Sequence, residues 1–355
     1  MAIVRSQSSS DSNTGEENTY DTSLSEDRLC NVLRPRTLAD FVGQNQLKRT
    51  LDVILEAAKK REETAPHLLF YGPPGLGKTT LASIIATEMG GSLRITSGPA
   101  IEKAGDLAAL LSNLQEGDVF FLDEIHRLRR PVEEMLYSAL EDFALDIIVG
   151  KGPGARSLRI QLPKFTFVAA TTRLGGLSSP LRDRFGESFR LEFYEPEDLE
   201  KIIHANAKKL NITVHPDSAS LIARSSRGTP RIANRLLHRL RDFSHVEHSD
   251  EISLSIAEKA LRELGVDNMG LTEGDRRFLR IVAEQFAGGP VGLSTLSAAT
   301  SEERETIEDI REPYLLQIGF LARTPQGRVL QEQAFHHIGF AIPHNEKQNA
   351  SLSLF

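Results

Sequence analysis

The chain has 355 residues, of which 40% are hydrophobic and 26% are charged. This length suits two or three globular domains, and the composition excludes a collagen-like, fibrous or wholly disordered chain. The formal net charge is -7, with 42 Lys plus Arg against 49 Asp plus Glu, so affinity for a polyanion has to come from local basic patches. The single cysteine, Cys30, excludes an internal disulfide, and the polar N-terminus has no signal-like apolar stretch. We therefore expect a soluble, cytoplasmic protein.

Changes in residue pattern divide the chain into four parts. Residues 1–28 are rich in Ser, Asn, Thr, Asp and Glu, and a segment of that kind buries too little apolar surface to order itself, so we expect a disordered tail. In 29–194, apolar runs alternate with helical periodicity, which predicts a parallel α/β sheet. Residues 195–266 have a purely helical pattern and predict a small all-α domain. In 267–355, helices precede two short apolar-flanked strands, an order typical of a winged helix.

The sheet is expected to be covered on both faces. Its apolar runs lie at 67–71, 119–122 and 165–170, and the run at 119–122 shows no alternation with polar residues. A strand that is apolar at every position is typical of a buried parallel sheet.

A phosphate loop lies between the first predicted strand and the first predicted helix of the sheet. Residues 72–79 match the pattern G-x-x-x-x-G-K-[ST]. The glycines let backbone amides close around phosphates, Lys78 is placed for the β- and γ-phosphates, and the Thr79 hydroxyl is placed for Mg²⁺. The predicted nucleotide contacts of the loop are Gly75, Gly77, Lys78, Thr79 and Thr80. We predict an ATP and Mg²⁺ site here.

Polar residues follow the two other apolar runs. Asp123 and Glu124 end one run, where Asp123 would orient Mg²⁺ and Glu124 would polarise an attacking water. Alone, such an acidic pair is also typical of a helix N-cap. Thr171 and Thr172 end the other run, and we favour Thr172 as a γ-phosphate sensor without excluding Thr171. His126 and the arginines after it suggest a solvated helix start.

Together with the arginines of SPLRDRFG (179–186) and GTPRIANR (228–235), these elements resemble the AAA+ ATPases. More narrowly, the chain is similar to the RuvB family of Holliday-junction branch-migration motors, from about Leu33 to Gly339. The similarity runs through LRPRTLADFVGQ, GPPGLGKTTLA, TSGPAIEKAGDLAALL, FLDEIHRL, TTRLGGLSSPLRDRFG, GTPRIANRLLHRLRDF and GGPVGLSTLSAA. The resemblance implies an α/β P-loop NTPase (AAA+) large domain, an all-α lid domain and a C-terminal winged-helix domain.

The resemblance also implies roles for two arginines. Arg184 matches the arginine that reaches the nucleotide of a neighbouring subunit, although surface pairing of Arg182 and Arg184 with Asp183 or Glu187 is the alternative. Arg231 matches the second sensor, which follows the γ-phosphate from the lid. Beyond Arg231, the arginine stripe along the helix suggests a solvated face, and contact with a neighbouring subunit or with nucleotide is the alternative. By resemblance alone, the nucleotide is further flanked by Leu33, Arg34, Tyr194, Glu141, Asp142 and Phe143.

A protruding hairpin is predicted around the Gly-rich stretch 150–154. In the family this insertion docks RuvA, the junction-binding partner, and the apolar contacts implied here are Ile147, Ile148, Leu158 and Ile160. Packing of the same side chains on their own domain is the alternative.

Contacts with duplex DNA are predicted from Arg304, Arg323 and Arg328 of the winged helix, which would meet phosphates without reading sequence. Residues 268–355 hold eight Lys plus Arg against eleven Asp plus Glu, so each subunit should bind weakly and a hexameric ring would add avidity. A protein-binding winged helix is the alternative.

The predicted function is that of a homohexameric ATPase that pulls duplex arms of Holliday junctions, with a RuvA-like partner and a RuvC-like resolvase in the same complex. Three alternatives are an ATP-switched, clamp-loader-like scaffold, a DEAH-type helicase suggested by residues 123–126, and a protein-unfolding AAA+ machine. The second helicase domain that a DEAH enzyme needs is not predicted from this sequence. A Glu124→Gln change would stall a motor and spare a scaffold.

Overall fold

The computed structural model describes residues 32–149 and 156–342. The chain divides into two compact units, 1–34 and 35–355, and the fold below is that of the second unit. The predicted tail (1–28), Cys30 and the Gly-rich centre of the predicted hairpin lie outside the described residues. Within the described ranges, no helix is both long and apolar enough to cross a membrane.

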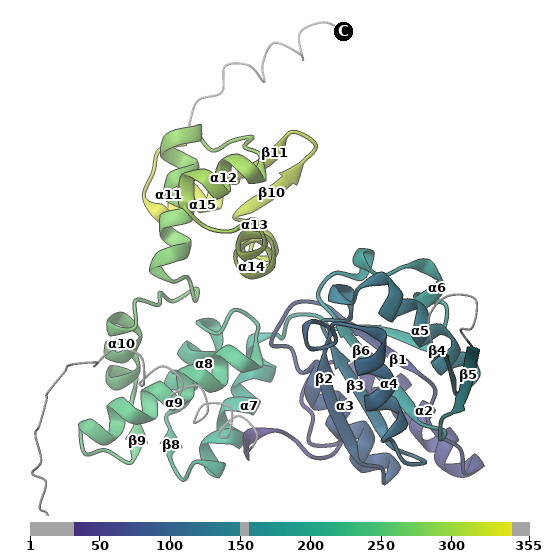
Figure 1. Cartoon of the computed structure of the whole chain (residues 1–355). Coiled ribbons are helices and arrows are strands. Elements are labelled where there is room, and N and C mark those ends of the chain that lie inside the picture. The colour runs from purple at the N-terminus through teal and green to yellow at the C-terminus, as the bar shows by residue number, and fades with distance from the viewer. Residues whose placement is uncertain (1–31, 150–155, 343–355) are drawn as a thin grey trace, which may run out of the picture. The chain divides into compact units, whose positions relative to one another are not determined.

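A five-stranded parallel sheet forms the core of the large domain, in the order β2-β3-β6-β1-β7 (Figure 1). Val168 of β6 pairs with Leu68 of β1 on one side and with Phe121 of β3 on the other, so the three strands end at the same edge. The strands are β1 (Leu68–Tyr71), β2 (Leu93–Ser97), β3 (Val119–Asp123), β6 (Thr166–Thr171) and β7 (Glu187–Arg190). The predicted parallel sheet is confirmed.

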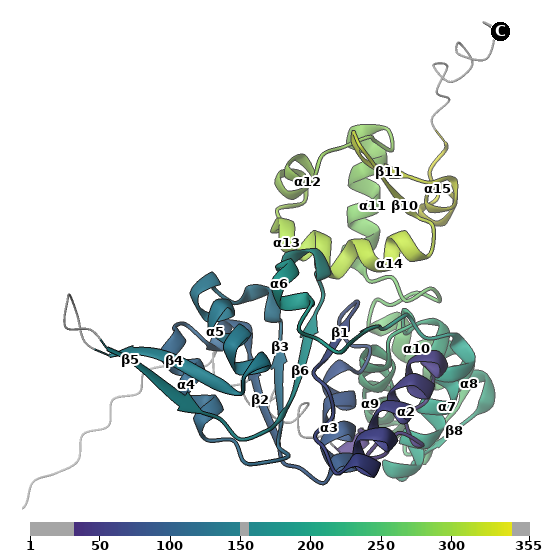
Figure 2. The same ribbon diagram turned by 90° about the vertical axis from the view of Figure 1, so that its right-hand side faces the viewer.

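Helices cover both faces of this sheet (Figure 2). Side chains alternate between faces along a strand, so Phe121 of β3 packs in one apolar cluster and Phe120 packs in the other, stacked on Phe167 at 5.8 Å between ring centroids. The prediction of a doubly covered sheet is therefore confirmed. The flanking helices are α2 (Asn45–Arg61) and α3 (Lys78–Met89) on the first face, and α4 (Ala104–Ser112) and α5 (Arg130–Glu141) on the second.

Short elements connect these layers and carry several of the predicted site residues. The antiparallel hairpin predicted near residue 150 is present as β4 (Ala144–Val149) and β5 (Arg156–Gln161), in a sheet of its own. The single turns are η1 (Gly98–Ala100), η2 (Ile125–Arg127), η4 (Leu174–Gly176) and α6 (Ser179–Arg182).

The lid is built of four helices, α7 (Pro196–Lys209), α8 (Pro216–Arg224), α9 (Pro230–Val246) and α10 (Leu254–Glu263). Three of them begin at a proline, whose fixed φ suits the first helical position. The sequence predicted a purely helical lid, and this prediction is wrong in one respect. The strand β8 (Thr213–Val214) pairs with β9 (Glu251–Ile252). Each is only two residues long, too short for a strand pattern to show in the sequence.

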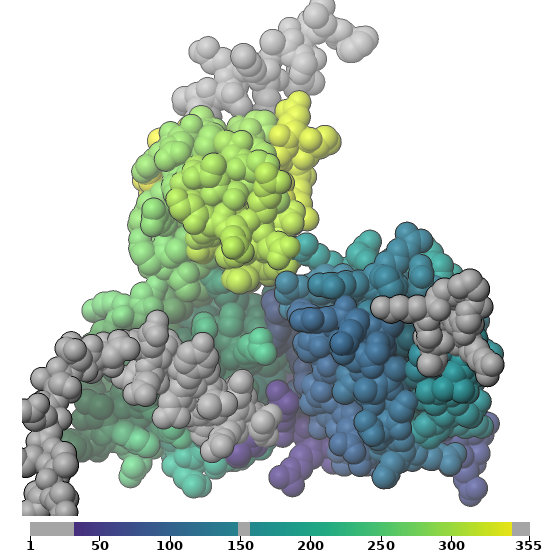
Figure 3. Space-filling model, viewed as in Figure 1, coloured from purple at the N-terminus to yellow at the C-terminus, as the bar shows by residue number. Residues whose placement is uncertain are grey.

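The C-terminal part is a winged helix with its own apolar core. Its helices are α11 (Glu273–Phe286), α12 (Leu293–Thr300), α13 (Arg304–Thr306), the π-helix η5 (Ile307–Arg311), α14 (Glu312–Gln317) and α15 (Glu332–Ile338). The wing is the hairpin of β10 (Leu321–Thr324) and β11 (Gly327–Leu330), and it lies at the surface of this domain (Figure 3). The two short strands that the sequence predicted after the helices are confirmed.

Candidate functional site

The phosphate loop (72–79) connects β1 to α3 in a conformation that glycine favours. Gly75 and Gly77 have φ of 80° and 105°, in the left-handed region where a side chain is strained. Lys78 is buried, with 8% of its surface exposed, and its Nζ donates to the carbonyls of Gly72 and Pro73 at 2.8 Å each. The lysine is therefore folded back onto the loop.

Three charges converge on this loop. Burial lowers the pKa of Lys78 to about 8, the negative charge of Asp123 opposes the shift, and the positive charge of Arg231 adds to it. Asp123 comes from the end of β3 and Arg231 from the start of α9. The strand order therefore brings the predicted acid to the predicted lysine, and the lid helix α9 brings the predicted second sensor there.

The acidic pair at the end of β3 splits into two different environments. The Asp123 carboxylate accepts a bond from the backbone N–H of Glu124 at 2.9 Å. Glu124 has a left-handed φ of 50°, and its half-exposed carboxylate pairs with Arg127 at 3.3 Å. Carboxylate and hydroxyl oxygens are the ligands that Mg²⁺ prefers, so the donor chemistry of Asp123 and Thr79 fits the ion.

The two threonines at the end of β6 have different partners. The fully buried Thr171 hydroxyl accepts from the backbone N–H of Arg173 and bonds His126 Nδ1, both at 3.0 Å. Thr172 is partly exposed, which favours it over Thr171 as the sensor. The expectation that His126 is solvated is wrong, since it is half-buried against β6 and burial lowers its pKa. Its position two residues after the acidic pair was the signal in the sequence.

The lid contacts the phosphate loop directly. The backbone N–H of Arg231 donates to the Gly75 carbonyl at 3.3 Å, and a Cβ on Gly75 would lie only 2.7 Å from Thr229 Cγ2. The buried Tyr194 hydroxyl donates to the Leu76 carbonyl at 3.3 Å. Arg231 and Tyr194, both predicted as nucleotide contacts, thus lie on the loop.

Arg184 is held by residues of α5 and α6. Its guanidinium pairs with Glu141 at 2.7 Å, donates to the Pro180 carbonyl at 2.6 Å and lies 4.6 Å from the ring centroid of Tyr137. The alternative of surface pairing with Asp183 or Glu187 is therefore not what the structure shows for Arg184. Arg182 instead donates to the Ser179 hydroxyl at 3.0 Å.

The other residues that the resemblance placed around the nucleotide do not share one environment. Asp142 pairs with Arg159 at 2.6 Å, and the Phe143 ring packs on Phe165 with centroids 5.7 Å apart. Leu33 and Arg34 belong to the first compact unit. Their contact with nucleotide stays a prediction, as does that of the Glu141–Phe143 triplet.

The predicted docking residues of the hairpin differ in how far they are buried. Ile147 and Ile160 are partly buried and pack against the core of their own domain, which is the alternative considered for them. Leu158 is 53% exposed. The side chain of Ile148 lies outside the described residues. Among the three predicted docking side chains that the structure describes, Leu158 is therefore the most accessible to a partner.

The predicted DNA contacts of the winged helix are not equivalent. Arg304 is exposed at the start of α13. Arg323 and Arg328 face each other across the wing and both bond the Glu312 carboxylate, which is fully buried. Arg323 remains 52% exposed, whereas Arg328 is only 15% exposed. Arg328 therefore holds the wing together rather than facing solvent, and sequence reasoning missed Glu312.

A phosphate loop on a parallel sheet of this order, an acidic pair at the end of β3 and a helical lid that reaches the loop define the AAA+ class of P-loop ATPases. Three family models match in succession: the Holliday junction DNA helicase RuvB P-loop domain over 33–191, the RuvB AAA lid domain over 194–267 and the RuvB C-terminal winged helix domain over 268–339. The chain belongs to the RuvB family.

Individual relatives agree with the family models. The Holliday junction branch migration complex subunits RuvB of Chloroflexus aggregans and Chloroflexus aurantiacus are each 56% identical over 311 residues, covering 88% of this chain and 89% of theirs. The solved Thermotoga maritima RuvB Holliday junction branch migration motor is 47% identical, with a TM-score of 0.82, over 88% of this chain and all of that one. Nucleotide binding follows from the P-loop family and the loop itself.

Proposed function

We propose that this chain is the ATP-driven motor of Holliday-junction branch migration, acting as a hexameric ring on duplex DNA in recombination and repair. The observation that carries the proposal is the convergence of Lys78, Asp123 and Arg231 on one phosphate loop. It occurs in a chain that matches all three RuvB domain models. Such work on chromosomal DNA agrees with the cytoplasmic location that the sequence predicts.

The chain's own residues supply the binding and orientation for hydrolysis. Lys78 would leave the Gly72 and Pro73 carbonyls to bind the β- and γ-phosphates, and Arg231 would approach the γ-phosphate from the lid. Thr79 and Asp123 would hold Mg²⁺, which neutralises phosphate charge when bound. Glu124 would leave Arg127 to orient the attacking water, and Thr172 would hydrogen-bond beside it.

Arg184 would complete the site of a neighbouring subunit. The contacts described for it are with α5 and α6 of its own domain, and they include the ion pair with Glu141 at the end of α5. An arginine supplied in trans can raise phosphoryl-transfer rates by about 10³ to 10⁵ because it neutralises transition-state charge. Hydrolysis would then require assembly, and it could pass from subunit to subunit around a ring.

The winged helices would hold the duplex. Arg304 and Arg323 are the exposed arginines of the predicted set, and phosphate contacts from several subunits add together on one duplex. Branch migration breaks one base pair for each pair it forms, each stacking step being worth about 1.4 kcal/mol, so the net change is near zero. ATP would supply direction rather than stability.

Partners would complete the machine. The exposed Leu158 on β5 is the proposed contact of a RuvA-like junction-binding protein, and a RuvC-like resolvase would act in the same complex. A single exposed leucine on a hairpin suits a small docking contact better than an extensive interface.

ATP turnover with four-way DNA, with and without the junction-binding partner, tests the proposal. We expect DNA and partner to stimulate the wild type, and Arg184→Ala to lose at least about 10³-fold in turnover while keeping nucleotide affinity within about twofold. Arg182→Ala, two residues away with only a Ser179 contact, is the matched control and should turn over normally. Full turnover by a strictly monomeric preparation, or by Arg184→Ala, would refute the shared site.

A further inference from the structure

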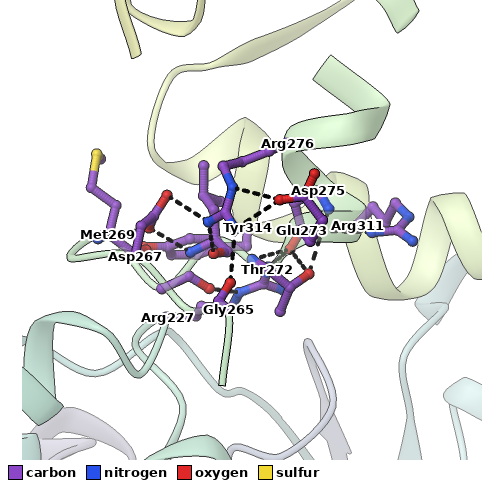
Figure 4. A network of polar contacts seen from close by, with 12 residues as sticks. Arg227, Gly265, Asp267, Met269, Thr272, Glu273, Asp275, Arg276, Arg311 and Tyr314 are labelled. Atoms are coloured by element: carbon purple, nitrogen blue, oxygen red, sulfur yellow. Dashed lines mark hydrogen bonds and ion pairs between the residues drawn. The ribbon is translucent and has the colours of Figure 1, made fainter. Parts of the chain in front are cut away.

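A cluster of buried charges joins the lid to the winged helix (Figure 4). At its centre is Asp275, in the first turn of α11, with only 1% of its surface exposed. Its carboxylate contacts Arg227 from the turn between α8 and α9, which we call the lid turn (225–229), and Arg311 from η5 at 3.0 Å. A lid residue and a winged-helix residue therefore share one buried carboxylate.

The electrostatics show how much this carboxylate depends on Arg227. Burial acts to raise the pKa of Asp275, but the positive charge of Arg227, hydrogen bonds from Thr272 and the charge of Arg311 outweigh it, so the net pKa is lowered. Arg227 is the largest of these opposing contributions. Removing the largest compensating charge from a buried carboxylate costs far more than the loss of a surface pair, although Arg311 and Thr272 remain.

Arg227 makes three different contacts with the winged-helix side. Its Nε donates to the Gly270 carbonyl at 2.7 Å, another guanidinium nitrogen bonds Asp275, and the guanidinium carbon lies 5.3 Å from the Tyr314 ring centroid. The planar guanidinium can bond two acceptors and stack at the same time, which a lysine cannot do. Its side chain is only 11% exposed. Arg227 thus belongs to neither a solvated face nor a simple surface ion pair.

The same turn leads directly to the phosphate loop. The Thr229 hydroxyl donates to the Arg227 carbonyl at 3.0 Å, and Arg231, four residues after Arg227, bonds Gly75 of the phosphate loop through its backbone N–H. A Cβ on Gly75 would also meet Thr229. The lid turn therefore has the phosphate loop at one end and Asp275 at the other.

Other polar contacts at this junction hold the linker rather than the lid. Arg276 donates to the carbonyls of Gly265 and Leu271 at 2.9 and 2.8 Å, and the Tyr314 hydroxyl donates to that of Met269 at 2.7 Å. These bonds fasten linker residues 265–271 to the winged helix. Arg227 differs because it lies in the lid turn itself.

We propose that Arg227 is a positioning residue of the motor, which ties the turn carrying Arg231 to the winged helix through Asp275. When nucleotide moves Arg231, Arg227 transmits that movement to the DNA-binding domain. The inference rests on the proposed function, since it names the residue that links its two activities. It assigns Arg227 no contact with nucleotide or DNA.

The test compares full-length Arg227→Ala and Arg227→Lys with Arg224→Ala, which removes an exposed arginine three residues earlier. Three quantities are measured for each: fluorescent ADP affinity, ATP turnover without DNA, and base pairs migrated per ATP on a four-way junction. For Arg227→Ala we expect the first two to stay within about twofold and the third to fall about tenfold, which is within the usual range of coupling between sites. Arg227→Lys should be intermediate, and Arg224→Ala should match the wild type.

Two results would overturn the inference. One is normal migration per ATP in Arg227→Ala, and the other is a DNA-free turnover that falls in the same proportion as migration, which would make Arg227 a support of the nucleotide site. Should the alanine variant not fold, Arg227→Lys decides by the same comparison. A wild type that hydrolyses ATP but moves no junction would refute the proposed function instead. In that case, the stimulation of ATP turnover by DNA would still measure the coupling between the nucleotide site and the winged helix.

Discussion

Lys78 should take up a proton when nucleotide binds. In the nucleotide-free protein its pKa is lowered to about 8 because the amine is buried. Phosphates of the nucleotide favour the charged amine, so binding raises this pKa again. Above about pH 8, the free protein has lost a proton that the complex holds. Nucleotide affinity should therefore fall as pH rises through this value.

The size of the effect follows from the pKa. With a pKa of about 8, roughly half a proton is taken up per nucleotide at pH 8 and about a tenth at pH 7. If only the charged amine binds, the Kd rises about tenfold between pH 7 and pH 9, equivalent to about 1.4 kcal/mol. The phosphates of the nucleotide are already ionised over this range and do not mask the change.

Calorimetry in buffers of different ionisation enthalpy measures the proton uptake directly. Arg231→Ala provides a second perturbation, because the positive charge of Arg231 lowers the pKa of Lys78. The midpoint of proton uptake should then move to higher pH even if affinity also changes. An uptake near zero at both pH 8 and pH 9 in the wild type would show that Lys78 stays charged without nucleotide, and would refute this reasoning.

Two further predictions concern backbone and buried charge. Gly75→Ala puts a Cβ 2.7 Å from Thr229 Cγ2 at a φ of 80°, so we expect nucleotide affinity to fall about tenfold in a fluorescence titration. The control Gly175→Ala, whose Cβ meets open space, should change the affinity less than about twofold. Equal affinities of the two variants would contradict this account of the loop. Glu312→Gln leaves Arg323 and Arg328 without their shared carboxylate and should lower the free energy of unfolding in urea by about 3–5 kcal/mol, against less than about 0.5 kcal/mol for the exposed Glu332→Gln. A loss below about 1 kcal/mol would mean that the wing does not depend on Glu312.

Much of the fold follows from local pattern. The apolar runs predicted β1, β3 and β6, and the phosphate-loop motif predicted the turn between β1 and α3, because backbone preferences and side-chain alternation act over a few residues. The two short strands of the wing were predicted in the same way. The two-residue strands β8 and β9 were not, since nothing local distinguishes them from loop.

The candidate site was predicted in part. The phosphate-loop motif named Lys78, the end of an apolar run named Asp123 and the family resemblance named Arg231. The strand order and the lid contact bring the three together. His126 was expected in solvent, yet it bonds Thr171 of the neighbouring strand. Its environment depends on Thr171 of β6, which lies 45 residues later in the chain, so the residues around His126 do not predict it.

The amino-acid sequence by itself determined the parallel sheet, the phosphate loop and the order of domains, because these depend on spacing and composition within short stretches. Only the tertiary structure decided what each charge does. Arg328 has a buried glutamate beneath the wing, and Arg227 meets Asp275, which is 48 residues away. The local sequence around an arginine does not predict its role. That role depends on the oppositely charged group that folding brings to the arginine and on how far water is excluded there.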